Sequence, residues 1–236
     1  MKGIIYYTDN RLEEPIYSIV QKQILKAKLP IISVSLKPMD FGRNIYLDLK
    51  PGIVTMFKQI LTALEASSAD VIFFCEHDVL YHLSHFDFNP PQNDIFYYNT
   101  KVWRWKYPED FAITYEHIIS LSNLCANRQL LVNHFRERLR IIEERGWNKE
   151  TGREPNWARR MGYEPGTKSI RQKIISDGFC QYWQSDYSNI DIRHSGTLTK
   201  TKCRLSDFKH PPSAESWKET TLDKIEGWNL KEMFNL

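Results

Sequence analysis

The sequence predicts an α/β protein with a mixed sheet flanked by helices, and three observations lead to this fold class. Strand-like apolar runs alternate with amphipathic helical runs over the first 78 residues, a pattern typical of parallel strands joined by right-handed crossovers. Polar clusters follow two of these strands, at the place where such sheets bind ligands. Hydrophobic residues are 42% and charged residues 26% of the chain, which is ordinary for a globular protein.

The first half of the chain contains three predicted strands and two predicted helices. The helices are expected because apolar residues recur at helical spacing on one face. The third strand is apolar enough to lie in the middle of a sheet. In chain order, strands and helices alternate at 3–8, 12–27, 30–36, 52–66 and 69–75, with a loop at 37–44.

The second half has weaker periodicity. A long helix is expected at 127–145, where Gly146 provides a stop signal. Residues 147–188 are rich in Trp, Arg, Gly and Pro, and we expect loops and short helices there, over the ligand-binding edge of the sheet. Further strands are expected at 94–100, 102–105, 111–115 and 189–194.

Charge, cysteine placement and hydropathy exclude several protein classes. The net charge of +3 suits an anionic ligand but lacks the dense basic footprint of a nucleic-acid binder. The 4 cysteines are far apart and form no CxxC pair, so neither a zinc cluster nor a disulfide framework is expected. The chain enters a strand at once without a signal-peptide pattern, and no apolar run approaches the roughly 20 residues of a membrane helix. We therefore expect a cytoplasmic protein.

The third predicted strand runs directly into Glu76, His77 and Asp78. Two carboxylates one residue apart at a strand end point roughly the same way, and carboxylates are the usual ligands of catalytic divalent cations. Such triplets also arise by chance among solvated surface charges. The position of this one, after an apolar strand and across from polar residues 8–10 at the end of the first strand, favours a site.

The histidines offer further candidate ligands. His77, His82 and His85 cluster near the triplet, but their spacing matches no known zinc signature. His194 ends the last predicted strand. It has two interpretations on sequence alone, an additional metal ligand or an ordinary loop histidine. An imidazole ligand would favour Mn²⁺ over Mg²⁺.

Four segments of the first half together resemble a known family. They are the strand ending Tyr-Thr-Asp-Asn, the loop Ser-Val-Ser-Leu-Lys-Pro-Met-Asp-Phe-Gly, the helix Thr-Met-Phe-Lys-Gln-Ile-Leu and the segment Phe-Phe-Cys-Glu-His-Asp-Val-Leu-Tyr. These look like small GT-A glycosyltransferases of bacterial or phage type, related to family 2. The resemblance covers roughly residues 1–100, with local support at 160–167 and 191–194.

The resemblance implies a GT-A (Rossmann-like) mixed sheet flanked by helices, with an irregular C-terminal acceptor-side region. It divides a single domain, 1–236, into a nucleotide-sugar-binding half at 1–100, an acceptor-side half at 101–210 and a surface tail at 211–236.

The same resemblance implies roles for individual residues. The acidic triplet of this family holds Mn²⁺ or Mg²⁺ together with the sugar nucleotide, which assigns the metal to Asp78, with His194 completing its ligand set. Glu76 and His77 are assigned to the nucleotide sugar. They depart from the family pattern, which has Asp at the first position and often an acidic residue at the second. Further nucleotide contacts are implied at Tyr7, Thr8, Asp9, Lys37 and Arg43.

An inverting transferase would also need a general base for the acceptor hydroxyl, whereas a retaining one would not, and the sequence leaves both open. Glu164, Asp177 and Asp186 are the candidates. Glu164 comes first because residues 162–166 form a constrained loop that could hold its carboxylate over the donor. An ordinary solvated loop glutamate is the alternative.

Three functions remain open from the sequence. The first is metal-dependent transfer of a sugar, with a UDP-sugar as the expected donor, to a hydroxyl of a saccharide, lipid-linked glycan or protein. The second is a viral-type enzyme that glycosylates hydroxymethylated DNA bases. The basic stretch 159–173 permits it, but a solvated helix face is the slightly favoured interpretation of that stretch. The third is a nucleotidyltransferase or an inactive nucleotide-binding module. The lack of glycine in residues 8–12, after the first strand, counts against a nucleotidyltransferase.

Overall fold

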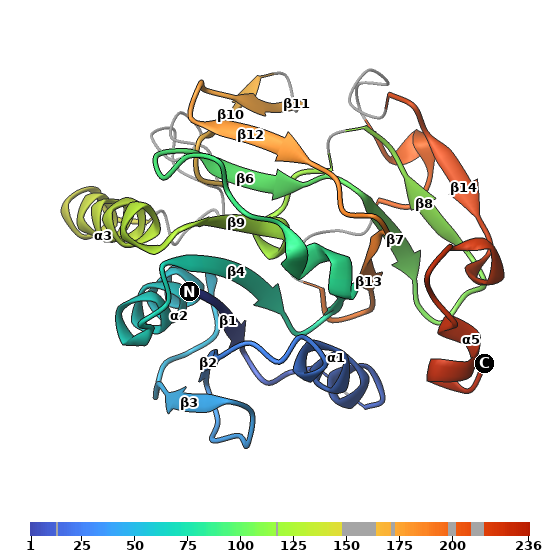
Figure 1. Ribbon diagram of the computed structural model, residues 1–236, viewed down its shortest axis with the longest axis horizontal. Coiled ribbons are helices and arrows are strands. Elements are labelled where there is room, and N and C mark those ends of the chain that lie inside the picture. The colour runs from blue at the N-terminus through green and yellow to red at the C-terminus, as the bar shows by residue number, and fades with distance from the viewer. Residues whose placement is uncertain (13, 117, 148–163, 171–172, 198–201, 209–214) are drawn as a thin grey trace.

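The computed structural model describes residues 1–12, 14–116, 118–147, 164–170, 173–197, 202–208 and 215–236, which build two main sheets and the helices around them (Figure 1). The larger sheet has the strand order β12-β6-β9-β4-β1-β2-β3 among these residues. Its strands are β1 (Lys2–Thr8), β2 (Ile31–Ser35), β3 (Arg43–Tyr46), β4 (Val71–Glu76), β6 (Phe96–Asn99), β9 (Leu124–Asn127) and β12 (Cys180–Trp183).

The pairing in this sheet is mixed, as the sequence predicts. β1 is parallel to β2 and to β4, and β2 is parallel to β3. β9 is antiparallel to both β4 and β6, while β6 and β12 are parallel to each other. The expected fold class, an α/β protein with a mixed sheet flanked by helices, is confirmed.

Helices cover both faces of the larger sheet because alternate side chains of its strands point to opposite faces. Ile4 and Tyr6 of β1 pack with helix α1 (Ile16–Leu25). Ile5 and Tyr7 pack on the other face with helices α2 (Ile53–Ala66) and α3 (Arg128–Arg145). The core therefore has two layers separated by the sheet.

A second sheet, with strand order β14-β8-β7-β13-β5, begins where β4 ends. Only His77 and Asp78 separate β4 from β5. The chain therefore crosses from the larger sheet to the second sheet at the predicted triplet. The strands are β5 (Val79–Leu80), β7 (Val102–Lys106), β8 (Ala112–Thr114), β13 (Asn189–Arg193) and β14 (Lys218–Thr220). The described residues also form the hairpin β10 (Thr167–Ile170) and β11 (Lys173–Ser176), and the short helices η1 (Leu83–Asp87), η2 (Leu121–Asn123), η3 (Leu205–Asp207), η5 (Leu222–Lys224) and α5 (Leu230–Phe234).

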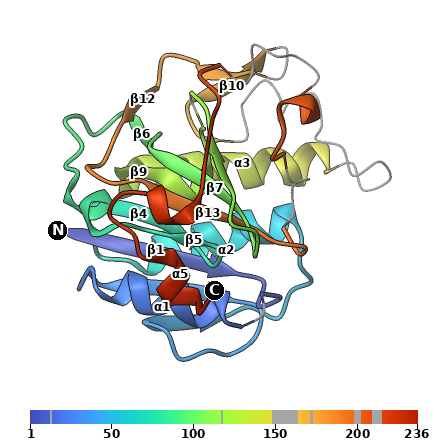
Figure 2. The same ribbon diagram turned by 90° about the vertical axis from the view of Figure 1, so that its right-hand side faces the viewer.

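The C-terminal segment contributes to the core. Leu222, Ile225, Leu230 and Phe234 are each at most 5% exposed and pack in the same cluster as β1 and α1. Figure 2 shows α5 lying beside α1. The segment expected as a surface tail therefore also contributes buried side chains to the core beside β1 and α1.

Several short strands differ from the sequence prediction. β3 begins in the predicted loop 37–44, and β9 precedes the long helix without having been predicted. The described part of 147–188 contains β10, β11 and β12 instead of loops and short helices. Each of these strands has only 4 residues, too few for an alternating pattern to stand out. Within the described ranges, no helix is long and apolar enough to cross a membrane.

Candidate metal centre

Two strand ends bring the candidate residues together. β1 and β4 run in register with Tyr7 opposite Glu76, so the polar end of β1 lies beside the triplet. β13 runs antiparallel to β5, and the Ile192 N–H donates to the Asp78 carbonyl at 2.8 Å. This pairing places His194, the residue after β13, beside Asp78.

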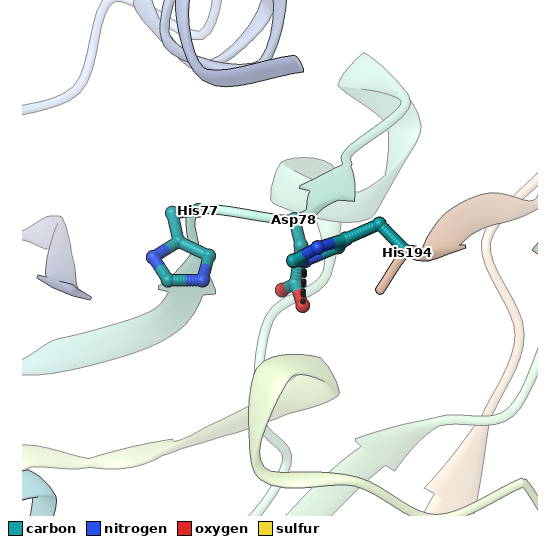
Figure 3. A group of neighbouring side chains, drawn as sticks. All are labelled: His77, Asp78 and His194. Atoms are coloured by element: carbon teal, nitrogen blue, oxygen red, sulfur yellow. Dashed lines mark ion pairs between the residues drawn. The ribbon is translucent and has the colours of Figure 1, made fainter. Parts of the chain in front are cut away.

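His77, Asp78 and His194 form a compact cluster. One potential ligand atom from each lies within 4.8 Å of the others, and His194 Nε2 is 3.6 Å from Asp78 Oδ2. Figure 3 shows the His194 ring against the Asp78 carboxylate, with the His77 ring to the left. Asp78 is buried, at 8% exposure, and both histidines are partly buried. The predicted metal residues Asp78 and His194 thus meet, and His77 joins them.

Residues of β1 hold the triplet in place. The Tyr7 hydroxyl donates to Glu76 Oε1 at 2.5 Å. Thr8 Oγ1 is 2.6 Å from His77 Nδ1, which leaves Nε2 as the His77 nitrogen available to a ligand. The predicted contacts Tyr7 and Thr8 therefore lie at the centre, where they orient the neighbouring Glu76 and His77.

Glu76 and Asp78 differ in electrostatic surroundings. Burial raises the pKa of Glu76, and the nearby Asp78 charge raises it further against the hydrogen bond from Tyr7. Burial would also raise the pKa of Asp78, but the nearby side chains of His194, His77 and Arg193 outweigh it, so that pKa is lowered. Asp78 is therefore the carboxylate that ionises readily, as a metal ligand must.

The cluster fits a divalent cation. His194 Nε2 is buried and has no hydrogen-bond partner among the described residues, and such an atom is uncommon in a folded protein. Two imidazoles and a carboxylate are a donor set suited to transition-metal ions such as Mn²⁺ and Zn²⁺. His77, Asp78 and His194 could hold such an ion.

Of the other predicted nucleotide contacts, Asp9 and Lys37 lie at or near the end of β1, whereas Arg43 is level with Ile5 two strands away. Asp9 forms a salt bridge to Arg11 at 2.6 Å. The Lys37 N–H donates to Asn10 Oδ1 at 2.9 Å, which ties the loop after β2 to the end of β1. The Arg43 side chain is exposed at the start of β3. Their contacts with a nucleotide stay predictions.

The three candidate bases lie in different settings. Glu164 is buried, at 8% exposure. Burial raises the pKa of the Tyr98 hydroxyl, and the charge of Glu164 raises it further while that of Arg138 lowers it, which places Glu164 near β6 and α3. Asp177 and Asp186 are exposed, and the Asp177 carboxylate accepts a backbone N–H in its own turn. Their catalytic role remains a prediction.

A charged group on the second sheet was missed by the sequence reasoning. Asp191 is 6% exposed and bonds both Arg104 Nε at 3.1 Å and Arg193 Nη1 at 3.2 Å. The positive charge of Arg193 acts on Glu76 and on Asp78. Alternation in Asn-Ile-Asp-Ile-Arg-His was the available signal, because it puts residues 191 and 193 on one face of a strand.

Three of the five basic residues in the stretch 159–173, namely Arg159, Arg160 and Arg171, lie outside the described residues. Its predicted role toward an anionic acceptor or DNA is therefore not addressed by the structure.

Comparison with known proteins adds a fold-level similarity. No protein-family model and no curated protein matches the sequence. The structure is similar to that of a glycosyltransferase involved in the glycosylation of the major capsid of PBCV-1, with a TM-score of 0.44 and 9% identity over 78% of this chain and 81% of that one. It is also similar to the bifunctional IspDF from Campylobacter jejuni, with a TM-score of 0.36 and 12% identity over 71% and 55% of the two chains.

The fold and the site together define a class. The protein is a Rossmann-like α/β protein with a candidate metal centre where its two sheets meet.

Proposed function

We propose that the protein is a metal-dependent glycosyltransferase that takes its sugar from a nucleotide sugar, with a UDP-sugar as the expected donor. The acceptor is a hydroxyl on a saccharide, lipid-linked glycan or protein. One observation carries the proposal: His77, Asp78 and His194 converge beside the polar end of β1, at the carboxyl ends of parallel strands. This is the edge where α/β sheets bind nucleotides.

Each residue of the centre has a distinct task in this proposal. Asp78, His77 and His194 would hold the cation, and a bound Mn²⁺ or Mg²⁺ supplies positive charge to the leaving diphosphate. Glu76 holds its proton more readily than an ordinary glutamate, so it adds little repulsion against a diphosphate. Its hydrogen bond to Tyr7 keeps it directed along the strand end, where a donor hydroxyl would bind.

The acceptor side is less defined. Glu164 is the first candidate for a general base and Asp177 the second, on the condition that the reaction inverts the sugar configuration. The burial of Glu164 supports a fixed carboxylate over a solvated one.

A thermal-shift experiment tests the metal centre. We expect UDP and Mn²⁺ together to stabilise the wild-type chain by about 2.7 kcal/mol when the ligand is 100-fold above its Kd, a rise on the order of 5–10 °C. Asp78→Asn should lose the Mn²⁺-dependent part of this shift. Asp87→Asn, which changes an exposed aspartate in η1, should keep it. A wild-type response from Asp78→Asn would overturn the proposal.

A further inference from the structure

The two histidines of the metal centre have different partners at Nδ1. His77 Nδ1 lies 2.6 Å from the hydroxyl of Thr8, a group that can donate or accept. His194 Nδ1 accepts the backbone N–H of Gly196 at 3.1 Å. A peptide N–H can only donate. The two rings are therefore not equivalent as ligands.

The Gly196 N–H decides where His194 carries its proton. A neutral imidazole has one N–H, so a ring that accepts at Nδ1 carries its proton on Nε2. His194 Nε2 is the nitrogen that faces Asp78, at 3.6 Å from Oδ2 (Figure 3). A nitrogen that binds a metal must be free of its proton. His194 therefore cannot bind a cation through Nε2 while it accepts from Gly196.

His77 has no such conflict. Its Nδ1 can carry the proton and donate to Thr8 Oγ1. The Asn10 N–H already donates to that oxygen at 3.0 Å, and a hydroxyl oxygen can accept twice. The Nε2 of His77 is then unprotonated and available. His77 can therefore bind a cation without moving its proton, and His77 and Asp78 are the two ligands of the centre that need no rearrangement.

We propose that the hydrogen bond from the Gly196 N–H to His194 Nδ1 keeps His194 from binding the cation until that bond breaks. This hydrogen bond is called the latch below, and the inference rests on the metal-dependent function proposed above. His77 and Asp78 bind the cation first. His194 joins when its Nε2 proton passes to solvent, its Nδ1 takes one up and the hydrogen bond to Gly196 breaks. The ring neither gains nor loses net charge. The turn must then change shape, because an Nδ1–H and the Gly196 N–H cannot face each other.

The latched turn is held by a second residue. The Thr197 hydroxyl donates to the His194 carbonyl at 2.7 Å, and the Thr197 N–H donates to it at 3.3 Å. These bonds do not involve the His194 ring. Thr197 therefore supplies a control that perturbs the same turn without removing the latch.

Nuclear magnetic resonance of the full chain with ¹⁵N-labelled histidine tests the latch directly, because long-range ¹H–¹⁵N couplings identify the protonated nitrogen of each ring. Zn²⁺ is the probe ion. Without metal we expect His194 to carry its proton on Nε2. At saturating Zn²⁺ we expect it on Nδ1, together with a shift of the Gly196 amide resonance.

The outcomes separate this inference from the proposed function. If Zn²⁺ binds, depends on Asp78, and leaves the His194 proton on Nε2, the latch is wrong while the metal centre stands. A His194 proton on Nδ1 before metal is added would also overturn it. Failure of Zn²⁺ to bind in any Asp78-dependent way would remove the metal centre itself.

A variant without the latch gives a second measurement. Gly196→Pro removes the N–H, and we expect two- to tenfold tighter Zn²⁺ binding because one hydrogen bond no longer has to break. Thr197→Val should leave the affinity within twofold. Equal affinities in the wild-type chain and a folded Gly196→Pro variant would contradict the latch. The wild-type resonance measurement decides the question if the proline variant does not fold.

Discussion

Glu76 and Asp78 show that surroundings, more than residue type, set the chemistry of single residues here. They stand one residue apart, yet the pKa of one is raised and that of the other lowered. Asp78 is close to two histidines and to Arg193, whereas the Glu76 carboxyl accepts a hydrogen bond from the neutral hydroxyl of Tyr7 and lies near the negative charge of Asp78. Asp78 is therefore the carboxylate of the two that more readily carries the negative charge needed to bind a divalent cation.

His85 is a buried histidine outside the metal centre. It is 0% exposed, and its Nδ1 lies 3.0 Å from Asn99 Nδ2 and 3.1 Å from Asn189 Nδ2. Both amide groups donate to it, so it is neutral with its proton on Nε2. Burial lowers its pKa from 6.5 to about 3.

The lowered pKa of His85 predicts that the free energy of unfolding decreases in acid. Below pH 6.5 the unfolded chain takes up a proton at His85 that the folded chain refuses until about pH 3. The free energy of unfolding therefore falls as the pH drops through this window, by about 2 kcal/mol from this residue between pH 7.5 and pH 5. Urea unfolding at a series of pH values measures it.

His85→Gln is the matched variant, because its amide oxygen can accept the same two N–H groups. The variant should be less stable than the wild-type chain at pH 7.5, but its stability should fall less steeply toward pH 5. Parallel pH profiles for the two proteins would show that His85 does not titrate as described.

At the scale of elements, a side chain of helix α2 forms hydrogen bonds to the ends of both β1 and β2. Gln59 is 3% exposed, and its Nε2 donates to the carbonyl of Thr8 at 2.8 Å and to that of Val34 at 3.1 Å. These carbonyls stand at or near the carboxyl ends of β1 and β2. The helix therefore fixes the spacing of the strand ends that face the candidate site.

Replacing Gln59 by Leu should lower the free energy of unfolding by about 1–3 kcal/mol, because buried carbonyl groups lose a donor. Gln23 is a useful comparison. It is 6% exposed on α1 and its Nε2 donates to one carbonyl, that of Tyr81, at 3.1 Å. We expect Gln23→Leu to cost less than Gln59→Leu in chemical denaturation. The reverse order would show that the two bonds of Gln59 contribute little.

The helices and strands differ in how well the sequence could predict them. Long apolar runs such as β4 and the regular spacing in α2 and α3 were sufficient, because their periodicity extends over many residues. β9 and β12 were not predictable, because neither 4-residue strand shows an alternating pattern of burial.

The candidate site was predictable only in part. Asp78 and Glu76 were found because they end an apolar strand. The bonds from Arg104 and Arg193 to Asp191 were missed. The bond from Arg104 depends on the pairing of β13 with β7, strands far apart in the sequence, whereas Arg193 lies on the same strand as Asp191.

At the scale of the whole molecule, the two sheets share one core. Ile4 of β1, Ile190 of β13 and Phe234 of α5 belong to the same buried cluster. The metal centre lies where these sheets join, since His77 and Asp78 connect β4 to β5 and His194 follows β13. We therefore expect the sheets to unfold as one cooperative unit, and the C-terminal helix to stabilise both.

Phe234→Ala tests this cooperativity. Phe234 is 5% exposed and packs edge-on against Trp105, with ring centroids 4.7 Å apart. Its loss should lower the free energy of unfolding by about 3 kcal/mol. Native-state amide exchange of the slowest amides should then accelerate by about a hundredfold in β1 as well as in β13, since both open in the same global event. Leu236→Ala, at a residue that is 53% exposed, should change stability by less than about 0.5 kcal/mol. Faster exchange confined to the second sheet would show that the two sheets open separately, and the centre between them would then lie at the boundary of two folding units.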